Sequence, residues 1–283
     1  MSYVVFDIGG TKTRVAVSKD LTKLDEVKVI KTAADFKTGM ADIEKIVKEI
    51  CPKKPDGFAG GVRGILDEDK SGIEADSILA DWAGRSIADE LHKISDVSVL
   101  IENDSAMAGL GEAVYGAGKG MDIVAYHTVS TGVGGVKIEN GMIDVSSMGF
   151  EPGHQILDID RTVLGEDIQP TLENLVSGTA LGRRFGVPAF EIPQDDVVWE
   201  ELAGYLAQGL RNTVMYWSPE AIVLGGAMIV GDPCISIEAI RKSTVEVLDG
   251  FVECPFITKA ALGDDAGLYG GLAVLSQSKG DSN

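Results

Sequence analysis

Cysteine is scarce in this sequence, and none of it is placed for a disulfide framework or a zinc site. Only Cys51, Cys234 and Cys254 occur in 283 residues, far apart and in no CxxC spacing. An odd number of isolated cysteines is typical of reduced, mostly buried thiols rather than of a crosslinked secreted domain. The fold must therefore be held by its core.

Basic residues and long apolar runs are also scarce. The chain has 25 Lys and Arg against 44 Asp and Glu, a formal net charge of −19, and shows no basic patch. Such a balance repels nucleic-acid phosphates and anionic membrane surfaces. No stretch reaches the roughly 18 apolar residues needed to cross a bilayer, and the first ten residues lack a signal-peptide pattern. We expect no nucleic acid and no membrane as partner, and a cytoplasmic location.

What is present is enough apolar sequence for two domains. Hydrophobic residues make up 45% and charged residues 24%, which is ordinary globular composition. A length of 283 residues exceeds that of a usual single domain. A glycine-rich stretch at 116–120 is a candidate hinge, so the sequence predicts two domains with a cleft between them.

Each predicted domain begins with a glycine-tipped β-hairpin. In the first, residues 3–8 and 13–17 flank Gly9-Gly10; in the second, 122–130 and 136–143 flank residues 131–135. A helix over about 40–51, ended by Pro52, follows the first hairpin, with strands at about 57–62 and 97–101. A long helix around 202–214 and a buried strand at 221–224 follow the second. Similar element types in one order indicate two related α/β halves.

The first hairpin tip has the composition of a phosphate site. Asp7 closes a strand, and Gly9 and Gly10 leave backbone N–H groups open to a ligand, while the Asp7 carboxylate can hold hydrated Mg²⁺. A Gly-Gly turn between strands is more often only a hairpin. Two such tips heading two similar halves favour a nucleotide clamped between them.

Asn103-Asp104 lies at the end of a predicted Val/Leu/Ile strand, where open α/β sheets bind ligands. A carboxylate there can act as a general base. Both side chains also cap helices well, so catalysis and capping remain equally open at this point. Glu151, His154 and Glu173 are compatible with sugar-hydroxyl recognition and equally with surface loops.

Together these motifs resemble the ROK family of sugar kinases, within the actin-like and hexokinase-like ATPases. The resemblance extends from Asp7 to the Gly270-Gly271 pair and rests on five motifs in order. They are DxGGTxxR at 7–14, Asn103-Asp104, the Gly-Thr-Gly-type loop at 130–132, ExGH at 151–154 and the adenosine-side segment at 219–226.

The resemblance implies a role for each motif. Asp104 corresponds to the catalytic base, and Asp7 to a Mg²⁺-binding carboxylate that acts through water. Sugar-binding positions are Asn103, Glu151, His154, Glu173 and Gly64. Nucleotide-binding positions are Asp7, Gly9, Gly10, Thr11, Lys12, Thr131, Gly132, Gly134, Gly225 and Gly226.

Two departures from the family pattern stand out. Family members usually carry a cysteine-rich zinc motif just after ExGH, whereas residues 155–171 contain no Cys, so structural zinc is not expected and the role of His154 is open. Arg63 replaces the proline of a G-x-P-G turn beside the sugar. A cation bordering the sugar pocket is one interpretation, and a solvent-directed side chain is the favoured one.

The resemblance predicts two RNase H-like domains, residues 1–115 with 264–283 and residues 116–263, with the active site in the cleft between them. It implies ATP- and Mg²⁺-dependent phosphorylation of a hexose or N-acylhexosamine, with the C6 hydroxyl as the expected acceptor. A homodimer is possible. The alternatives are a sugar-binding protein without turnover and a regulator, although family repressors carry a DNA-binding segment before the first hairpin and Asp7 comes early here.

Overall fold

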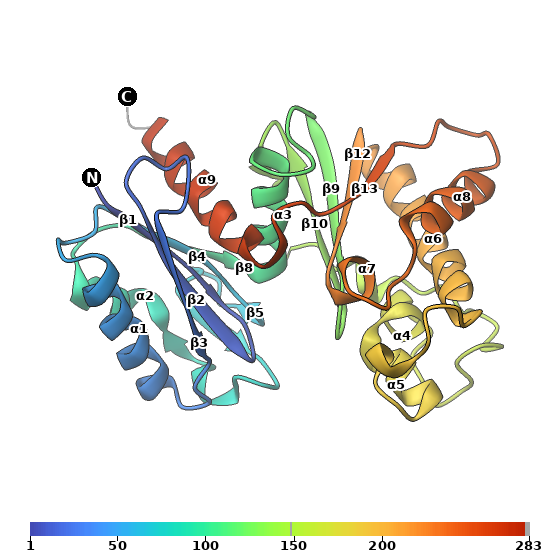
Figure 1. Cartoon of the computed structure of the whole chain (residues 1–283), viewed down its shortest axis with the longest axis horizontal. Coiled ribbons are helices and arrows are strands. Elements are labelled where there is room, and N and C mark those ends of the chain that lie inside the picture. The colour runs from blue at the N-terminus through green and yellow to red at the C-terminus, as the bar shows by residue number, and fades with distance from the viewer. Residues whose placement is uncertain (148, 281–283) are drawn as a thin grey trace. The chain divides into compact units, whose positions relative to one another are not determined.

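The computed structural model describes residues 1–147 and 149–280, and these divide into two α/β units (Figure 1). Unit 1 contains residues 1–115 and those from 264 on, and unit 2 contains residues 116–263. Each unit is built on a five-stranded sheet of its own.

The sheet of unit 1 has the strand order β3-β2-β1-β4-β8. β1 pairs antiparallel with β2, and β2 with β3, whereas β1, β4 and β8 are parallel. The main elements are β1 (Tyr3–Ile8), β2 (Lys12–Ser18), β3 (Glu26–Lys31), α1 (Phe36–Ile50), β4 (Phe58–Val62), α2 (Ile87–Ile94), β8 (Val99–Asn103), α3 (Asp104–Val114) and α9 (Ala266–Gly280). A small second sheet joins β5 (Ile65–Leu66), β6 (Gly72–Ala75) and β7 (Arg85–Ser86).

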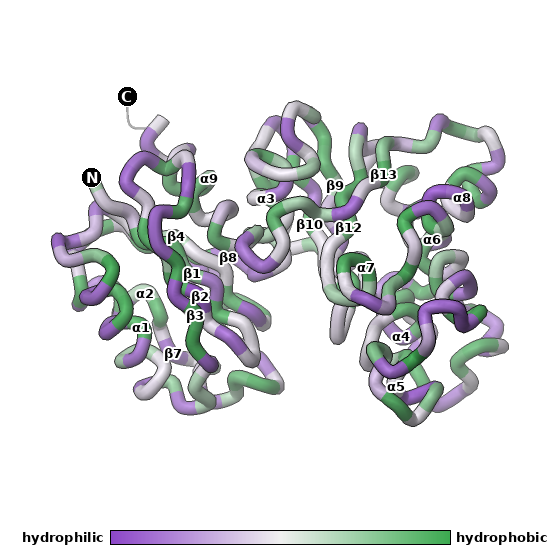
Figure 2. Tube along the Cα trace, viewed as in Figure 1, coloured by the Kyte–Doolittle hydropathy of each residue, from purple (hydrophilic) through white to green (hydrophobic). Residues whose placement is uncertain are grey.

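Alternation along β1 divides the core of unit 1 between the two sheet faces. Val4, Phe6 and Ile8 pack with the buried stripe of α1, while Tyr3 and Val5 pack with α9. Figure 2 shows the hydrophobic stretches of the strands and of these helices. This is the period-two pattern of a sheet covered on both faces.

Two glycines let α9 approach α3 closely. A Cβ on Gly270 would lie 1.9 Å from the Met107 carbonyl oxygen, and one on Gly111 would lie 2.2 Å from the carbonyl oxygen of Ala266. No side chain fits either gap, because real Cβ atoms essentially never come within 3.0 Å of another heavy atom. The C-terminal helix is therefore seated in unit 1 by backbone-to-backbone contact.

Unit 2 has the strand order β11-β10-β9-β12-β13, with the same antiparallel hairpin followed by parallel strands as in unit 1. Its strands are β9 (Ile123–Val129), β10 (Val133–Glu139), β11 (Met142–Ile143), β12 (Ala221–Gly225) and β13 (Phe256–Lys259). Its helices are η2 (Pro152–His154), α4 (Leu172–Val176), α5 (Gly178–Phe185), α6 (Val198–Trp217), α7 (Ala227–Val230) and α8 (Ile237–Leu248). α6, buried along one side, packs against α8.

The α/β fold and the two glycine-tipped hairpins predicted from the sequence are confirmed. The first helix begins at Phe36, four residues before its predicted start, because the Asp35 side chain caps it by accepting from the backbone N–H of Thr38 at 2.7 Å. The sequence interpretation missed β3, the small sheet, α8 and β13. Over the described residues, no helix combines the length and the apolar character that membrane crossing requires.

His127 is a neutral group buried in the core of unit 2. It is fully buried on β9, its Nε2 lies 3.0 Å from the Thr213 hydroxyl, and its ring stacks on Trp217. No described residue provides a hydrogen-bond partner for its Nδ1. Burial lowers the pKa of His127 to about 4.

This buried histidine should make unit 2 acid-sensitive. The folded pKa lies below the unfolded value of about 6.5, so its stability contribution is complete above pH 6.5 and is lost as the pH falls toward 4. The wild type should lose about 3 kcal/mol more than His127→Leu in free energy of unfolding between pH 7 and pH 4. Urea titrations at both pH values measure this, with His92→Leu on the exposed face of α2 as control. Equal losses in wild type and His127→Leu would contradict it.

Candidate functional site

The central feature of unit 1 is the edge where β1, β4 and β8 end together. Ile8 pairs with Val62, and Val62 pairs with Asn103. Gly9, Arg63 and Asp104 are therefore equivalent residues, each the first after its strand. Such an edge is where open α/β sheets bind ligands, and it carries residues from three of the predicted motifs.

The tip of the first hairpin is a rigid turn. The backbone N–H of Gly9 donates to the Lys12 carbonyl at 3.0 Å, and the Thr32 hydroxyl donates to the Gly9 carbonyl at 2.7 Å. Thr11 and Lys12 are exposed, while Gly9 and Gly10 are partly exposed. The turn thus presents glycine backbone at the surface of unit 1, as a phosphate loop requires.

Asp7 lies beneath this turn in an acidic setting. Its side chain is 19% exposed, and a Cβ on Gly267 of α9 would lie 3.3 Å from its carboxyl carbon. Burial, and after it the negative charge of Asp104, raises the pKa of Asp7 to about 7, although the Arg14 guanidinium 3.8 Å away opposes the rise. Arg14 also pairs with Asp264. An added positive charge would relieve this carboxylate, so the site fits a hydrated Mg²⁺.

The structure separates the two roles left open for Asn103-Asp104. Asn103 is the N-cap of α3: its side-chain oxygen accepts from the backbone N–H groups of Ser105 at 3.0 Å and Ala106 at 3.3 Å. Asp104 is the first helical residue, and among the described residues its carboxylate accepts from Ser105 alone, from the backbone N–H at 2.8 Å and from the hydroxyl at 3.4 Å. Burial raises the pKa of Asp104, which makes its carboxylate a better proton acceptor. Asn103 therefore caps α3, and the carboxylate of Asp104 is not needed for capping.

Gly64, which follows Arg63, lies on the same edge, and its backbone takes a conformation that favours glycine. Its φ is +100°, and a Cβ there would lie 2.9 Å from the carbonyl oxygen of Ala75. The Asn103 side-chain amide donates to the Gly64 carbonyl at 3.3 Å. Two of the predicted sugar-binding positions are therefore in direct contact.

Arg63 does not point into solvent, so the favoured interpretation of this residue was wrong. Its Nε donates to Asp76 at 2.9 Å, and its side chain is 29% exposed. The Asp76 carboxylate, 4% exposed, also accepts from the backbone N–H groups of Ile78 and Leu79 at 2.7 and 2.6 Å. No local pattern indicates this pair, because Asp76 lies 13 residues further along the chain.

In unit 2 the second glycine loop lies beside Glu173. The Oε2 atom of Glu173 accepts from the backbone N–H of Val133 at 2.9 Å, and a Cβ on Gly132 would lie 2.6 Å from it. The backbone N–H of Gly178 donates to the Ser130 carbonyl at 2.7 Å, which ties the loop to α5. The structure therefore brings the predicted phosphate loop (Thr131, Gly132) and the predicted sugar contact Glu173 together.

Of the remaining predicted nucleotide residues of unit 2, Gly134 is the second residue of β10 and pairs with Thr128, and Gly225 and Gly226 lie where β12 ends. Gly225 ends β12 and pairs with Thr128 of β9, and Gly226 has a φ of +85° and begins α7. A Cβ on Gly226 would lie 2.3 Å from the Val129 carbonyl. This edge of the sheet in unit 2 corresponds to the Gly9–Asp104 edge in unit 1.

The predicted ExGH element is a 3-10 turn, η2, with Glu151 as its N-cap residue. Pro152 and Gly153 are buried against β10, where a Cβ on Gly153 would lie 2.2 Å from the Val133 carbonyl. Glu151 and His154 are exposed. Their packed neighbours hold these two side chains at the surface of unit 2.

The cysteine-free loop over residues 155–171 is organised by a carboxylate. Asp158, buried, accepts from the backbone N–H groups of Thr162 at 3.1 Å, Val163 at 3.2 Å and Leu164 at 2.8 Å. The N–H of Leu164 in particular lowers the pKa of Asp158. Sequence reasoning missed Asp158, since only the closing of the loop brings these donors to it.

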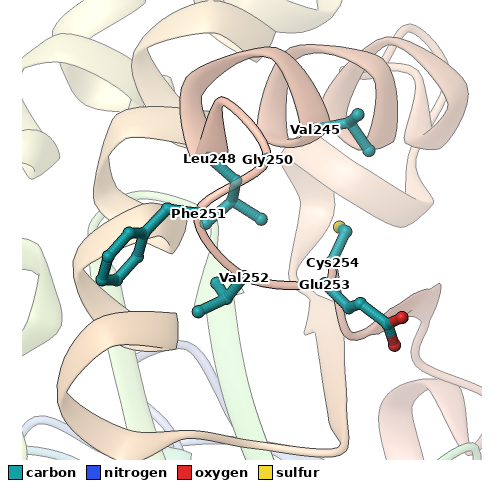
Figure 3. A pocket seen from close by; sticks show the side chains of 7 residues that line it. All are labelled: Val245, Leu248, Gly250, Phe251, Val252, Glu253 and Cys254. Carbon is teal, nitrogen blue, oxygen red and sulfur yellow. The ribbon is translucent and has the colours of Figure 1, made fainter.

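A hollow in the surface of unit 2 is a poor candidate for the site. It is lined by Val245, Leu248, Gly250, Phe251, Val252, Glu253 and Cys254 (Figure 3). Apolar side chains dominate, and Glu253 is its one charged side chain. Sugar and phosphate recognition needs several polar groups, which this hollow lacks.

Direct metal ligation is not built into the described ranges. Across residues 1–147 and 149–280, no group of three His, Cys, Asp or Glu side chains is arranged to hold an ion. Mg²⁺ usually keeps several waters and binds through one or two carboxylates and substrate phosphates, so Asp7 suffices for the predicted mode.

Comparison with known proteins agrees with these motifs. The model of the ROK family matches residues 3–278. A fructokinase from Lactococcus lactis subsp. cremoris is 27% identical over 263 residues, which cover 89% of this chain and 87% of that protein. The chain belongs to the ROK family.

Two solved structures share the fold over nearly the whole chain. The ROK hexokinase from Thermus thermophilus is 26% identical with a TM-score of 0.81, covering 99% of this chain and 100% of that one. A ROK glucokinase from Streptomyces griseus in complex with glucose and AMPPNP is 25% identical with a TM-score of 0.78, covering 98% and 100%. The fold is therefore the actin- and hexokinase-type fold.

The Asp158 hydrogen bonds predict a test of loop order. Asp158→Ala should lower Tm by several degrees, because three backbone N–H groups lose their acceptor, and should weaken sugar binding, because the loop joins η2 to the helix that carries Glu173. Asp160→Ala, an exposed neighbour, is the control. Thermal melts and sugar calorimetry measure both effects, and identical melts for the two variants would refute the role of Asp158.

Proposed function

We propose that this enzyme, an ATP-dependent sugar kinase of the ROK family, phosphorylates a hydroxyl of a hexose or an N-acylhexosamine with Asp104 as general base. The observation that carries the proposal is the edge of unit 1, where the Gly9-Gly10 turn follows β1 and Asp104 follows β8, the strands on either side of β4. A phosphate held at the turn and a hydroxyl held at Asp104 would be close enough to react.

The chemistry asked of Asp104 is proton removal. As the sugar oxygen forms its bond to the terminal phosphorus of ATP, the bond to the ADP oxygen breaks, and the hydroxyl proton passes to the Asp104 carboxylate. Asn103, held by α3 and by Gly64, would orient the sugar together with Gly64, Glu151, His154 and Glu173. Because phosphoryl transfer has a loose transition state, catalysis depends mainly on positioning and charge stabilisation.

The glycine loops and Asp7 would serve the nucleotide. The nucleotide residues of unit 1 are Gly9, Gly10, Thr11 and Lys12, and those of unit 2 are Thr131, Gly132, Gly134, Gly225 and Gly226. Bound Mg²⁺ would neutralise phosphate charge, with Asp7 holding it through water. The raised pKa of Asp7 is the physical sign that this position favours an added cation.

The sugar itself is tested by a coupled ADP-release assay. Fructose, glucose, mannose and N-acetylmannosamine form the panel, because the chain resembles both a fructokinase and a glucokinase. Turnover on at least one of them is expected, with phosphate on the C6 hydroxyl as shown by NMR of the product. Sugar binding without turnover on any of them would favour the non-catalytic alternative.

Asp104→Asn tests the base. Asn103 caps α3, so the variant should melt within about a degree of the wild type, while kcat should fall roughly 10²- to 10⁴-fold because an amide cannot accept the proton. Sugar Kd should change less, since the amide still hydrogen-bonds a hydroxyl. Asp89→Asn, an exposed first-turn residue of α2, is the matched control. A near-normal kcat would move the role of base to another residue, with Glu151 next.

A further inference from the structure

Arg63 occupies the middle of the edge on which the proposed chemistry takes place. β4 lies between β1 and β8, so Arg63 has the Gly9-Gly10 turn on one side and Asn103-Asp104 on the other. Its own backbone N–H donates to the Ile8 carbonyl at 3.1 Å, which continues the ladder and fixes its position.

The Arg63 side chain reaches over the phosphate turn. A Cβ built on Gly10 would lie 2.8 Å from Nη1 of Arg63 and 3.2 Å from its Cδ, so the guanidinium packs directly on the α-carbon of Gly10. Residue 10 must be glycine for the guanidinium to lie there.

Arg63 also acts electrostatically on Asp104. Burial raises the pKa of Asp104, and the backbone N–H of Ser105 and the positive charge of Arg63 oppose that rise. The same guanidinium is therefore near both groups between which a phosphoryl group would pass.

Asp76 fixes the orientation of this guanidinium. Its carboxylate accepts a hydrogen bond from Nε of Arg63 and is itself fixed by the backbone N–H groups of Ile78 and Leu79, which donate to it. Burial alone would raise the pKa of Asp76, but the N–H of Leu79 and the Arg63 guanidinium outweigh it and lower the pKa, so the pair stays charged. No described residue gives Nη1 or Nη2 of Arg63 a hydrogen-bond or ion-pair partner. Two NH2 groups, whose orientation Asp76 fixes, thus remain free for an anion.

We propose that Arg63 is a catalytic residue whose Nη groups contact the phosphoryl group during transfer. This rests on the proposed function, since it needs phosphate at Gly9-Gly10 and the acceptor hydroxyl at Asp104. A preorganised guanidinium stabilises charge on the equatorial oxygens of a transferring phosphoryl group without reorganising at the moment of reaction. The rival role, contact with the sugar ring, would alter sugar preference instead of the transfer step.

The test compares Arg63→Met, Arg63→Lys and Arg85→Met. Arg85 is the matched control, because it is also an arginine of unit 1 paired with an aspartate, Asp81, at 3.2 Å and lies on the surface. Kinetics with saturating ATP on the sugar panel, sugar Kd by calorimetry and melting temperature are measured for each. A double variant, Arg63→Met with Asp76→Asn, removes the unpaired buried carboxylate that would otherwise destabilise the fold.

The expected result is a kcat lowered roughly 10²- to 10³-fold in Arg63→Met and in the double variant. Sugar Kd and the order of preference among sugars should stay within about threefold of the wild type. Arg63→Lys should recover part of the loss, and added guanidinium should raise kcat of Arg63→Met but not of Arg85→Met.

Two results overturn the assignment while leaving the kinase proposal intact. One is a kcat within threefold of the wild type in the double variant, and the other is a tenfold change in sugar preference with kcat on the best sugar retained. A wild type that turns over no sugar overturns the proposed function itself, and the role of Arg63 with it.

Discussion

The parallel register of β1, β4 and β8 is the constraint on which the rest of the site depends. Because Ile8, Val62 and Asn103 lie in line across the sheet, the next residue of each strand reaches the same edge. A slip of one residue in β4 would turn Arg63 to the opposite face and leave Gly10 uncovered. The positions of the candidate site residues in unit 1 therefore depend first on the pairing of these strands.

Electrostatics at this edge follow from placing acids where water is partly excluded. Burial raises the pKa of both Asp7 and Asp104, and the charge of Asp104 raises that of Asp7 further. Arg14 opposes the rise at Asp7, and the Ser105 N–H and then Arg63 oppose it at Asp104. Each arginine is held by a second carboxylate, Asp264 or Asp76. In a chain of net charge −19, the cations at this edge are few and held by carboxylates, which would suit the proposed phosphate site without favouring polyanions in general.

The hairpins, the strand ends and Asn103-Asp104 could be predicted from the sequence because their signals are local. Gly9-Gly10 and the turn at Gly132 are glycine-rich segments directly beside β-rich apolar sequence, so a short window of sequence predicts them. Local patterns alone did not show which residue of Asn103-Asp104 caps α3; the hydrogen bonds of α3 show that it is Asn103. The motifs of unit 1 identified residues that lie together at this edge, and their roles in binding and catalysis stay predictions.

What the sequence could not show depends on partners far along the chain. Arg63 was expected in solvent because nothing within a few residues pairs with it, and its orientation follows from Asp76 across a small sheet that was itself missed. Strands of two residues, such as β5 and β7, are too short to show the alternation of apolar and polar residues by which a strand is recognised. Asp158 was missed for another reason: its donors lie four to six residues along the chain, but only the conformation of the closed loop brings them to its carboxylate. Three-dimensional geometry, rather than composition, revealed these residues.

The return of the chain to unit 1 has a consequence for synthesis on the ribosome. Unit 2 is one uninterrupted stretch of chain, whereas unit 1 is complete only when α9 has been synthesised. α9 packs on β1, β4 and α3, and Leu268 and Leu272 belong to this contact. Unit 2 can be complete while one face of the first sheet is still bare. The apolar side chains of that face, Tyr3, Val5 and Ala59 among them, stay exposed until α9 emerges. The nascent chain is therefore most prone to aggregation in its oldest part, and a truncation that removes α9 would prolong that vulnerable state indefinitely.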